Sequence, residues 1–243
     1  MGSAARALKG IFVLQIALAM GLLVADLTAN PSVEGLRLPL PGVRAPGLDA
    51  PVVPGDQRRR FAPRNLPDLP AAGDMPSRLL IETEGEILTL RGAIAAGDAA
   101  RLAEWAEERG ELPDRVTLLS LGGSVGDALA IGRMLRAAGS SVTVPADGLC
   151  LSACPYILAG GVARYVGEGA AIGVHQHYHG ENSILPAFLA VESIQRGQAE
   201  VMSYLAGMGV DPLIMVPAMS TPPNEVYVLL PEELQDYRLT TEP

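Results

Sequence analysis

The sequence has little lysine, cysteine and histidine, and each shortage excludes a class of chemistry. Of 18 basic residues in 243, only Lys9 is a lysine, so no catalytic or Schiff-base lysine lies in the later part of the chain. Cys150 and Cys154 are the only cysteines, too few for a disulfide framework or for a zinc site built from thiolates alone. The three histidines all fall within residues 175–179. Chemistry that depends on a histidine must therefore use this one segment.

Charge is distributed unevenly along the chain. Residues 1–76 carry 8 basic and 6 acidic side chains, a charge of +2, whereas residues 77–243 carry 10 basic and 21 acidic side chains, a charge of −11. Such an acidic domain repels polyanions, so nucleic acid is not expected as a partner. The apolar fraction of 49% is enough to form a hydrophobic core.

Residues 1–29 are predicted to direct the chain to a membrane. Arg6 and Lys9 precede an uncharged apolar run at residues 11–25. This order is typical both of a cleaved signal peptide and of a retained signal anchor. We favour an inner-membrane anchor that contacts the bilayer through residues 10–28, with the domain in the periplasm. Secretion into the periplasm after cleavage is the alternative.

Residues 30–76 are predicted to be a proline-rich linker. They contain ten prolines and the basic run Arg58–Arg60, without helical or strand periodicity. In the extended polyproline form, at ~3.1 Å per residue, such a segment spans on the order of 140 Å.

Residues 77–243 alternate predicted strands with predicted helices, which indicates one α/β domain with crossover connections. The predicted strands are 79–81, 87–90, 116–121, 141–145, 163–166, 171–175 and 226–230. The predicted helices are 97–109, a helix after residue 123, a short helix after residue 154, an amphipathic helix at 185–207, and a last helix that begins at residue 231.

Three junctions in this pattern carry unusual residues. Gly122-Gly123 follows a buried-type strand, where glycines let the backbone turn sharply and present amide N–H groups. Ser152 lies at a strand-to-helix turn, either as a helix cap or as an exposed nucleophile with the Ala153 amide beside its reaction site. The third junction is the histidine segment, in which strand alternation places His175, His177 and His179 on one face if the strand extends that far.

These junctions resemble the proteolytic subunit of the Clp protease in order and spacing. The matching segments are the glycine-rich turn at 120–125, the nucleophile turn at 152–161, the His-Gln segment at 174–176, and the segment at 225–233 that follows the family's acidic residue. His175 follows Ser152 by 23 residues, a spacing close to that of the family. The resemblance covers residues 85–238 and is closest to the exported or membrane-anchored Clp-like proteins of bacteria.

The resemblance implies a Clp/crotonase-type spiral of βαβ units and a serine peptidase that acts on peptides or unfolded proteins, without a cofactor. It implies Ser152 as nucleophile, His175 as general base and Glu225 as the acid, with Asn224 as the other candidate for the third position. The backbone oxyanion donors it implies are Gly123, Ser124 and Ala153. Related proteins form rings or trimers, so we expect a homo-oligomer with the helix at 185–207 as a docking surface.

Two other functions remain open from the sequence. The groove of such a fold can bind peptides or a protein partner without catalysis. Alternatively, His175, His177 and His179 can ligate zinc, with a cysteine thiolate as a further ligand. Cys150 and Cys154 are either small buried residues or, in an oxidising compartment, a disulfide that would fix the serine turn.

Overall fold

The computed structural model describes residues 2–29, 60–61, 75–177 and 187–241. The chain divides into two units, Met1–Val52 and Val53–Pro243. In the first unit, α1 (Gly2–Ala29) is a single helix that exposes large apolar side chains, among them Phe12 at 61% and Leu22 at 71%. Within the described ranges, no helix combines the length and the apolarity that crossing a membrane requires.

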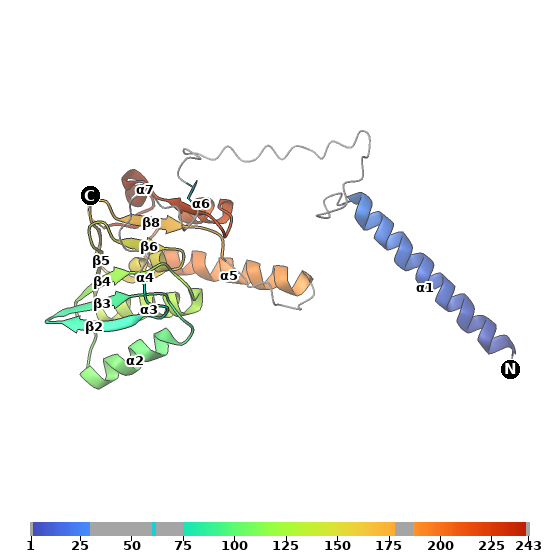
Figure 1. Cartoon of the computed structure of the whole chain (residues 1–243), viewed down its shortest axis with the longest axis horizontal. Helices are drawn as coiled ribbons and strands as arrows, with labels where there is room; N and C mark the ends of the chain where they lie inside the picture. Colours follow the sequence, from blue (N-terminus) through green and yellow to red (C-terminus); the bar gives the residue numbers. More distant parts are fainter. Residues whose placement is uncertain (1, 30–59, 62–74, 178–186, 242–243) are drawn as a thin grey trace. The chain divides into compact units, whose positions relative to one another are not determined.

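The second unit is a mixed α/β domain built on two sheets, which confirms the predicted α/β class (Figure 1). The larger sheet has the strand order β2-β3-β4-β5-β7, in which β2 is antiparallel to β3 and the other neighbours are parallel. Its strands are β2 (Leu80–Glu84), β3 (Ile87–Arg91), β4 (Arg115–Leu119), β5 (Ser141–Val144) and β7 (Arg164–Val166).

The smaller sheet has the order β1-β9-β8-β6, with β6 parallel to β8 and the other neighbours antiparallel. Its strands are β1 (Arg60–Phe61), β6 (Leu149–Leu151), β8 (Ala171–Val174) and β9 (Val226–Val228). The chain after β4 connects the two sheets, because Ser120 N–H donates to the carbonyl of Leu149 at 2.9 Å and the Ser120 carbonyl accepts from Leu151 N–H at 3.0 Å. The ends of β4, β6 and β8 therefore lie close together.

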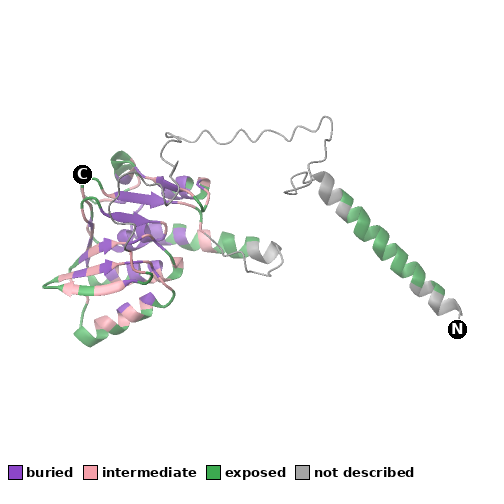
Figure 2. Ribbon diagram, in the orientation of Figure 1, coloured by how far each residue is buried: buried purple, intermediate pink, exposed green. Residues whose placement is uncertain are grey.

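Helices cover the sheets and bury their apolar faces against them (Figure 2). They are α2 (Asp98–Arg109), α3 (Val125–Ala138), α4 (Cys154–Gly160), α5 (Ala187–Gly207), the 3₁₀ helix η2 (Pro212–Ile214), α6 (Met215–Ser220) and α7 (Pro231–Asp236). Helix α3 buries Leu129, Ile131 and Leu135, as its spacing predicts. It approaches α4 so closely that a Cβ on Gly160 would lie 2.3 Å from the Gly132 carbonyl oxygen.

The C-terminal half of α5 packs against the domain, whereas the described side chains at 191–196 are exposed. Val201 and Leu205 are buried there, whereas Val191 and Ile194 on the preceding turns are 53% and 37% exposed. The N-terminal half extends beyond the sheets (Figure 1). The amphipathic pattern thus continues past the surface that the domain itself covers.

Charged side chains fix several element ends. The buried carboxylate of Asp98 accepts hydrogen bonds from the Arg78 and Arg101 guanidinium groups at 2.7 and 2.8 Å, and from backbone N–H groups of Leu79 and Ala95. Burial alone would raise the pKa of Asp98, but these hydrogen bonds outweigh it and lower the pKa, so the carboxylate is ionised at neutral pH.

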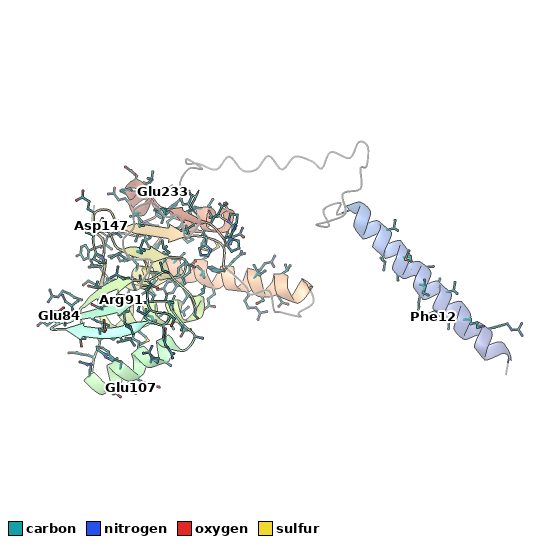
Figure 3. The ribbon with its side chains drawn as sticks, viewed as in Figure 1. Phe12, Glu84, Arg91, Glu107, Asp147 and Glu233 are labelled. Atoms are coloured by element: carbon teal, nitrogen blue, oxygen red, sulfur yellow. A yellow bond between two sulfur atoms is a disulfide. The ribbon has the colours of Figure 1, made fainter. Side chains whose placement is uncertain are left out.

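A similar arrangement holds the start of α7. Glu233, which Figure 3 labels, accepts from the Tyr227 hydroxyl at 2.7 Å and from Leu230 N–H at 2.8 Å. A strand residue and a helix cap therefore share one carboxylate. By contrast, Glu84 and Glu107 in the same figure are exposed surface charges.

One element differs from the predicted organisation. The linker prediction covers residues 30–76, yet Arg60 pairs with Tyr227 and Phe61 with Val226 in the antiparallel β1–β9 ladder. A two-residue strand has no periodicity to read in a sequence, and only its pairing with β9 reveals it.

Candidate active site

Ser152 occupies a strained turn between β6 and α4. All three residues of β6 are buried, and the strand ends at Leu151. Ser152 then takes a left-handed backbone conformation, with φ of 62°, while its N–H donates to the Gly173 carbonyl at 2.8 Å. Non-glycine residues rarely adopt this conformation, and they keep it only where the surrounding structure enforces it. A serine on such a strand-to-helix turn is the arrangement used by nucleophile elbows.

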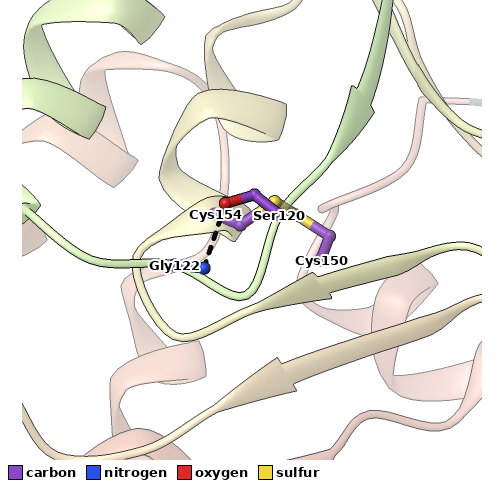
Figure 4. The surroundings of a disulfide bond; sticks show 4 residues. All are labelled: Ser120, Gly122, Cys150 and Cys154. Atoms are coloured by element: carbon purple, nitrogen blue, oxygen red, sulfur yellow. Dashed lines mark hydrogen bonds between the residues drawn. A yellow bond between two sulfur atoms is a disulfide. The ribbon is translucent and has the colours of Figure 1, made fainter. Parts of the chain in front are cut away.

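A disulfide closes the same turn. Cys150 and Cys154 are bonded across Ser152, with their Cα atoms 5.1 Å apart, and both residues are completely buried (Figure 4). From the sequence, Cys150 and Cys154 could be either two buried thiols or a disulfide, and the structure has the disulfide. The pair also joins the last strand before the turn to the first residue of α4.

The Gly122-Gly123 turn packs directly on the serine turn. A Cβ on Gly122 would lie 2.5 Å from the Ser152 Cβ and 2.9 Å from the Ala153 nitrogen, and one on Gly123 would lie 2.2 Å from the Ile94 carbonyl oxygen. Both glycines also have positive φ, 93° and 140°. The buried Ser120 hydroxyl supports this turn by accepting a hydrogen bond from Gly122 N–H at 3.0 Å (Figure 4). Only glycine fits at these two positions.

Two backbone amides at this contact donate to no described residue. Within the part of the chain that the structure describes, neither Gly123 N–H nor Ala153 N–H donates a hydrogen bond. Two such donors from neighbouring turns are the elements of an oxyanion hole. Ser124 does not add a third, because its N–H donates to the Ile94 carbonyl at 2.7 Å. Its hydroxyl instead caps α3, accepting from Asp127 N–H at 3.3 Å.

His175 directly follows β8, the strand beside β6. The register pairs Leu151 with Gly173, so Ser152 and His175 come from adjacent strand ends. Burial lowers the pKa of the His175 imidazole, and a backbone hydrogen bond with Gln176 opposes this shift without cancelling it. The imidazole is therefore neutral at pH 7 and able to accept a proton. No hydrogen bond joins its ring to the Ser152 hydroxyl among the described residues.

Neither candidate for the third triad position hydrogen-bonds the imidazole in the described part of the chain. The buried Nδ1 of His175 has no hydrogen-bond partner among the described residues. The antiparallel β8–β9 ladder ends at the pair Val174–Tyr227, and beyond it Gln176 N–H donates to the Thr221 carbonyl at 2.9 Å, so Glu225 lies outside the ladder. Asn224 is exposed. The acidic member that the resemblance implies stays a prediction.

A cavity of about 280 Å³ opens beside His175. Its described lining comes from the β8 end, α5 and α6, and none of these side chains carries a formal charge when the imidazoles are neutral: His175, Gln176, His177, Ile194, Gln198, Met215, Ala218 and Met219. Sequence reasoning did not identify the contributions from α5 and α6. Their lining residues are ordinary apolar and amide side chains on helices, and no pattern in the sequence marks them.

His177 also lines this cavity and contacts α4. Its Nε2 is 2.8 Å from the hydroxyl of Tyr156, whose buried position raises the phenol pKa. The contact between His177 and Tyr156 was also not predicted, because the sequence pattern indicates only that Tyr156 is a core residue of a short helix. His179 lies outside the described residues.

The zinc alternative loses part of its ligand set in this arrangement. Both cysteine sulfurs are used in the disulfide, so neither offers a thiolate. In the described ranges, no three histidine, cysteine, aspartate or glutamate side chains gather as metal ligands.

Comparisons with known proteins give no relative from which a function can be taken. No protein-family model matches the chain, and no curated protein sequence is significantly similar to it. The function must therefore be argued from the site itself.

Proposed function

We propose that this protein is an extracytoplasmic serine hydrolase of the Clp/crotonase type that cleaves peptide bonds. One observation carries the proposal: Ser152 has a left-handed conformation on a strand-to-helix turn, directly against the Gly122 turn. The unpartnered amides of Gly123 and Ala153 flank this point, and His175 ends the neighbouring strand. A turn that served only to start a helix would not require a strained serine.

In the proposed mechanism, the neutral His175 imidazole takes the proton of the Ser152 hydroxyl as the oxygen attacks the scissile carbonyl carbon. The N–H groups of Gly123 and Ala153 stabilise the resulting oxyanion. The imidazolium then protonates the leaving amine, and water releases the acyl group by the reverse proton transfers. Because no carboxylate among the described residues hydrogen-bonds the His175 Nδ1, the proposed mechanism uses a Ser-His dyad, and we expect slow turnover.

The cavity beside His175 supports a preference for uncharged peptide side chains. Ile194, Met215 and Met219 supply apolar surface, and Gln176 and Gln198 supply amide groups. A lysine, arginine or acidic side chain of a substrate would lose its hydration there without gaining an opposite charge. Medium-sized uncharged residues next to the scissile bond are therefore the proposed substrates.

A fluorophosphonate probe tests the proposal, because it reacts only with an activated serine. The full-length protein in mild detergent should be labelled at Ser152, and the label should be lost in Ser152→Ala and reduced at least 100-fold in His175→Ala. Ser141→Ala is the matched control: the Ser141 hydroxyl donates to the Asp114 carbonyl in an exposed contact at the start of β5, and labelling should be unchanged. Equal labelling of Ser152→Ala and wild type would overturn the assignment.

A non-catalytic peptide-binding module is the second candidate, and one observation favours it. The described residues include no hydrogen bond from Ser152 to His175 and no partner for His175 Nδ1. If folded wild-type protein resists labelling but binds uncharged peptides, and if Met219→Glu in the cavity abolishes that binding, this function replaces hydrolysis.

We further propose that the chain attaches to the inner membrane through residues 10–28 and acts in the periplasm as a homo-oligomer. The exposed apolar side chains of α1 and the disulfide at Cys150 and Cys154 support the location. The exposed half of α5 supports self-association. Fractionation of cells expressing the full chain, followed by protease treatment of spheroplasts, tests the location: the domain should be degraded only from the periplasmic side.

A further inference from the structure

The disulfide at the serine turn closes an unusually short loop. Only three residues separate Cys150 from Cys154. The stabilisation that a disulfide gives to a whole fold comes largely from restricting the unfolded chain, and this effect decreases as the loop becomes shorter. Both sulfurs are also buried, where two thiols would pack acceptably as small apolar groups. Global stability is therefore a poor explanation for this bond.

The disulfide restricts the local conformation of the serine turn much more strongly than it stabilises the whole fold. Cα atoms four residues apart in an extended chain are separated by ~13 Å, whereas those of Cys150 and Cys154 lie 5.1 Å apart. The bond thus excludes every extended conformation of the turn and keeps the chain reversed at Ser152. A residue held at φ of 62° needs such a constraint, since it relaxes when its surroundings allow it.

The other constraints on the turn are weaker than a covalent bond. Ser152 N–H donates one hydrogen bond to the Gly173 carbonyl, and Gly122 limits the turn from one side by contact alone. Relaxation of Ser152 towards an ordinary conformation would rotate its side chain and move the Ala153 amide. Both the nucleophile and one of the two unpartnered amides would then leave their positions together.

We propose that the Cys150–Cys154 disulfide is a positioning element that makes Ser152 reactive, so that the hydrolase matures only where its two thiols are oxidised. The inference rests on the proposed hydrolase function. In the maturation step a disulfide oxidant such as oxidised glutathione accepts two electrons and two protons from the thiols and is released as two thiols. The bond forms between the two Sγ atoms, and no other bond of the protein changes.

The test compares the rate constant of fluorophosphonate labelling in the full-length wild type and in Cys150→Ala/Cys154→Ala. We expect labelling of the double variant to be at least tenfold slower. Leu102→Ala is the control for stability, because it opens a cavity under α2, away from the serine turn, and lowers the melting temperature. Leu102→Ala should be labelled at the wild-type rate even if its melting temperature is below that of the double cysteine variant.

A second measurement uses the wild-type chain itself, in case the double variant fails to fold. Protein refolded with its thiols reduced should label slowly, and oxidised glutathione should restore the rate as the free thiols, counted by mass spectrometry, fall from two to none. Equal labelling of the reduced and oxidised forms, or of the double variant and wild type, would overturn the positioning role and leave the hydrolase intact. Absence of labelling in oxidised, folded wild type would instead refute the hydrolase, and this inference with it.

Discussion

At the scale of single residues, Gly122 is the strictest requirement of the site. A methyl group there would lie 2.5 Å from the Ser152 Cβ, closer than two carbon atoms can approach without displacement. We expect Gly122→Ala to lower the rate of fluorophosphonate labelling at least 100-fold, because the serine turn and the Ala153 amide must move. The measurement is labelling at a temperature where the variant remains folded by circular dichroism.

Gly110 offers a matched control for this substitution. It has the same φ of 93°, at the end of α2, but a Cβ there would meet no atom within 4 Å. Gly110→Ala thus carries the same backbone cost, about 1 kcal/mol or slightly more, without touching Ser152. If both variants lose labelling equally, the loss reflects stability and the contact with Ser152 is irrelevant.

The second residue-scale prediction concerns pH. Because burial lowers the pKa of His175, labelling should reach half of its maximum at a pH below 6.5, the value of an unperturbed histidine. The same shift acts on stability: below pH 6.5 the unfolded chain binds more protons at this residue than the folded chain does. Stability from His175 is therefore complete above pH 6.5 and is lost as the pH falls through the lowered pKa.

Urea denaturation of wild type and His175→Gln at pH 7.5 and pH 5 measures this contribution. The variant should lose less stability than wild type between the two pH values, since glutamine does not titrate. His177 and Asp98 are present in both proteins, so their contributions to the pH dependence of stability cancel in the comparison. A larger loss in the variant would contradict the direction of the pKa shift.

The residues of the site differ in how far the sequence alone could place them. Ser152 and His175 were singled out by the resemblance to the Clp proteolytic subunit, and the predicted strand 171–175 also placed His175 at a strand end. The three-residue strand β6 before Ser152 was not among the predicted strands. The hydrogen bond of the Ser124 N–H was not predictable from the sequence, because its acceptor, the Ile94 carbonyl, is brought to it only by the tertiary fold. The position of Glu225 was not predictable either, because β9 begins only at Val226 and the β8–β9 ladder does not reach Glu225.

At the scale of elements, the end of α4 depends on one arginine from α3. The Arg136 guanidinium donates to the carbonyls of Ala159, Gly160 and Gly161 at 2.9–3.0 Å and to that of Met208 at the end of α5. Removing it leaves several partly buried acceptors unpaired, at about 1–3 kcal/mol for a fully buried one. We expect Arg136→Met to lower the free energy of unfolding by roughly 3 kcal/mol in urea denaturation.

Arg133 on the same helix is the control. Its guanidinium is half exposed, with an ion pair to Glu200 at 3.3 Å and a position over the Tyr204 ring. Exposed contacts of this kind contribute up to about 1 kcal/mol each. Arg133→Met should therefore cost clearly less than Arg136→Met, and equal costs would show that the carbonyl contacts add little.

Element prediction from sequence succeeded where the period was long enough to read. In helix α3 the buried residues recur at helical spacing, and in strands β3 and β4 every second residue is buried, so these elements could be predicted. The short elements η2 and α6 were missed, since three to six residues hold less than two helical turns. For α5 the apolar face was found, but the domain covers only half of it.

At the scale of the whole molecule, the uncovered half of α5 leads to a prediction about assembly. Ile194 is 37% exposed and also lines the cavity beside His175, so a second copy docked on this half would border the site. We expect Val191→Asp to lower the sedimentation coefficient of the full-length protein by dissociating the oligomer. The carboxylate would be buried without a partner in the interface.

Val162→Asp is the corresponding control, because Val162 is 45% exposed on the loop after α4. It adds the same charge outside α5 and should leave the sedimentation coefficient unchanged. Identical coefficients for wild type and Val191→Asp would exclude α5 as the docking surface.

The arrangement of the two sheets lay beyond sequence reasoning. Strand alternation with helices was enough to predict an α/β domain, but the pairing of β9 with β8 and β1 joins segments more than 50 residues apart in one case and more than 160 in the other. Non-local pairings are decided by the packing of the complete chain, which no window of the sequence contains.

The pairing of β1 with β9 ties residues 60–61 into the sheet that carries the proposed base. Arg60 pairs with Tyr227 and Phe61 with Val226, and β9 in turn pairs with β8, the strand that His175 follows. A mechanical force applied to the chain at Arg60 would therefore reach the candidate site through two neighbouring strands.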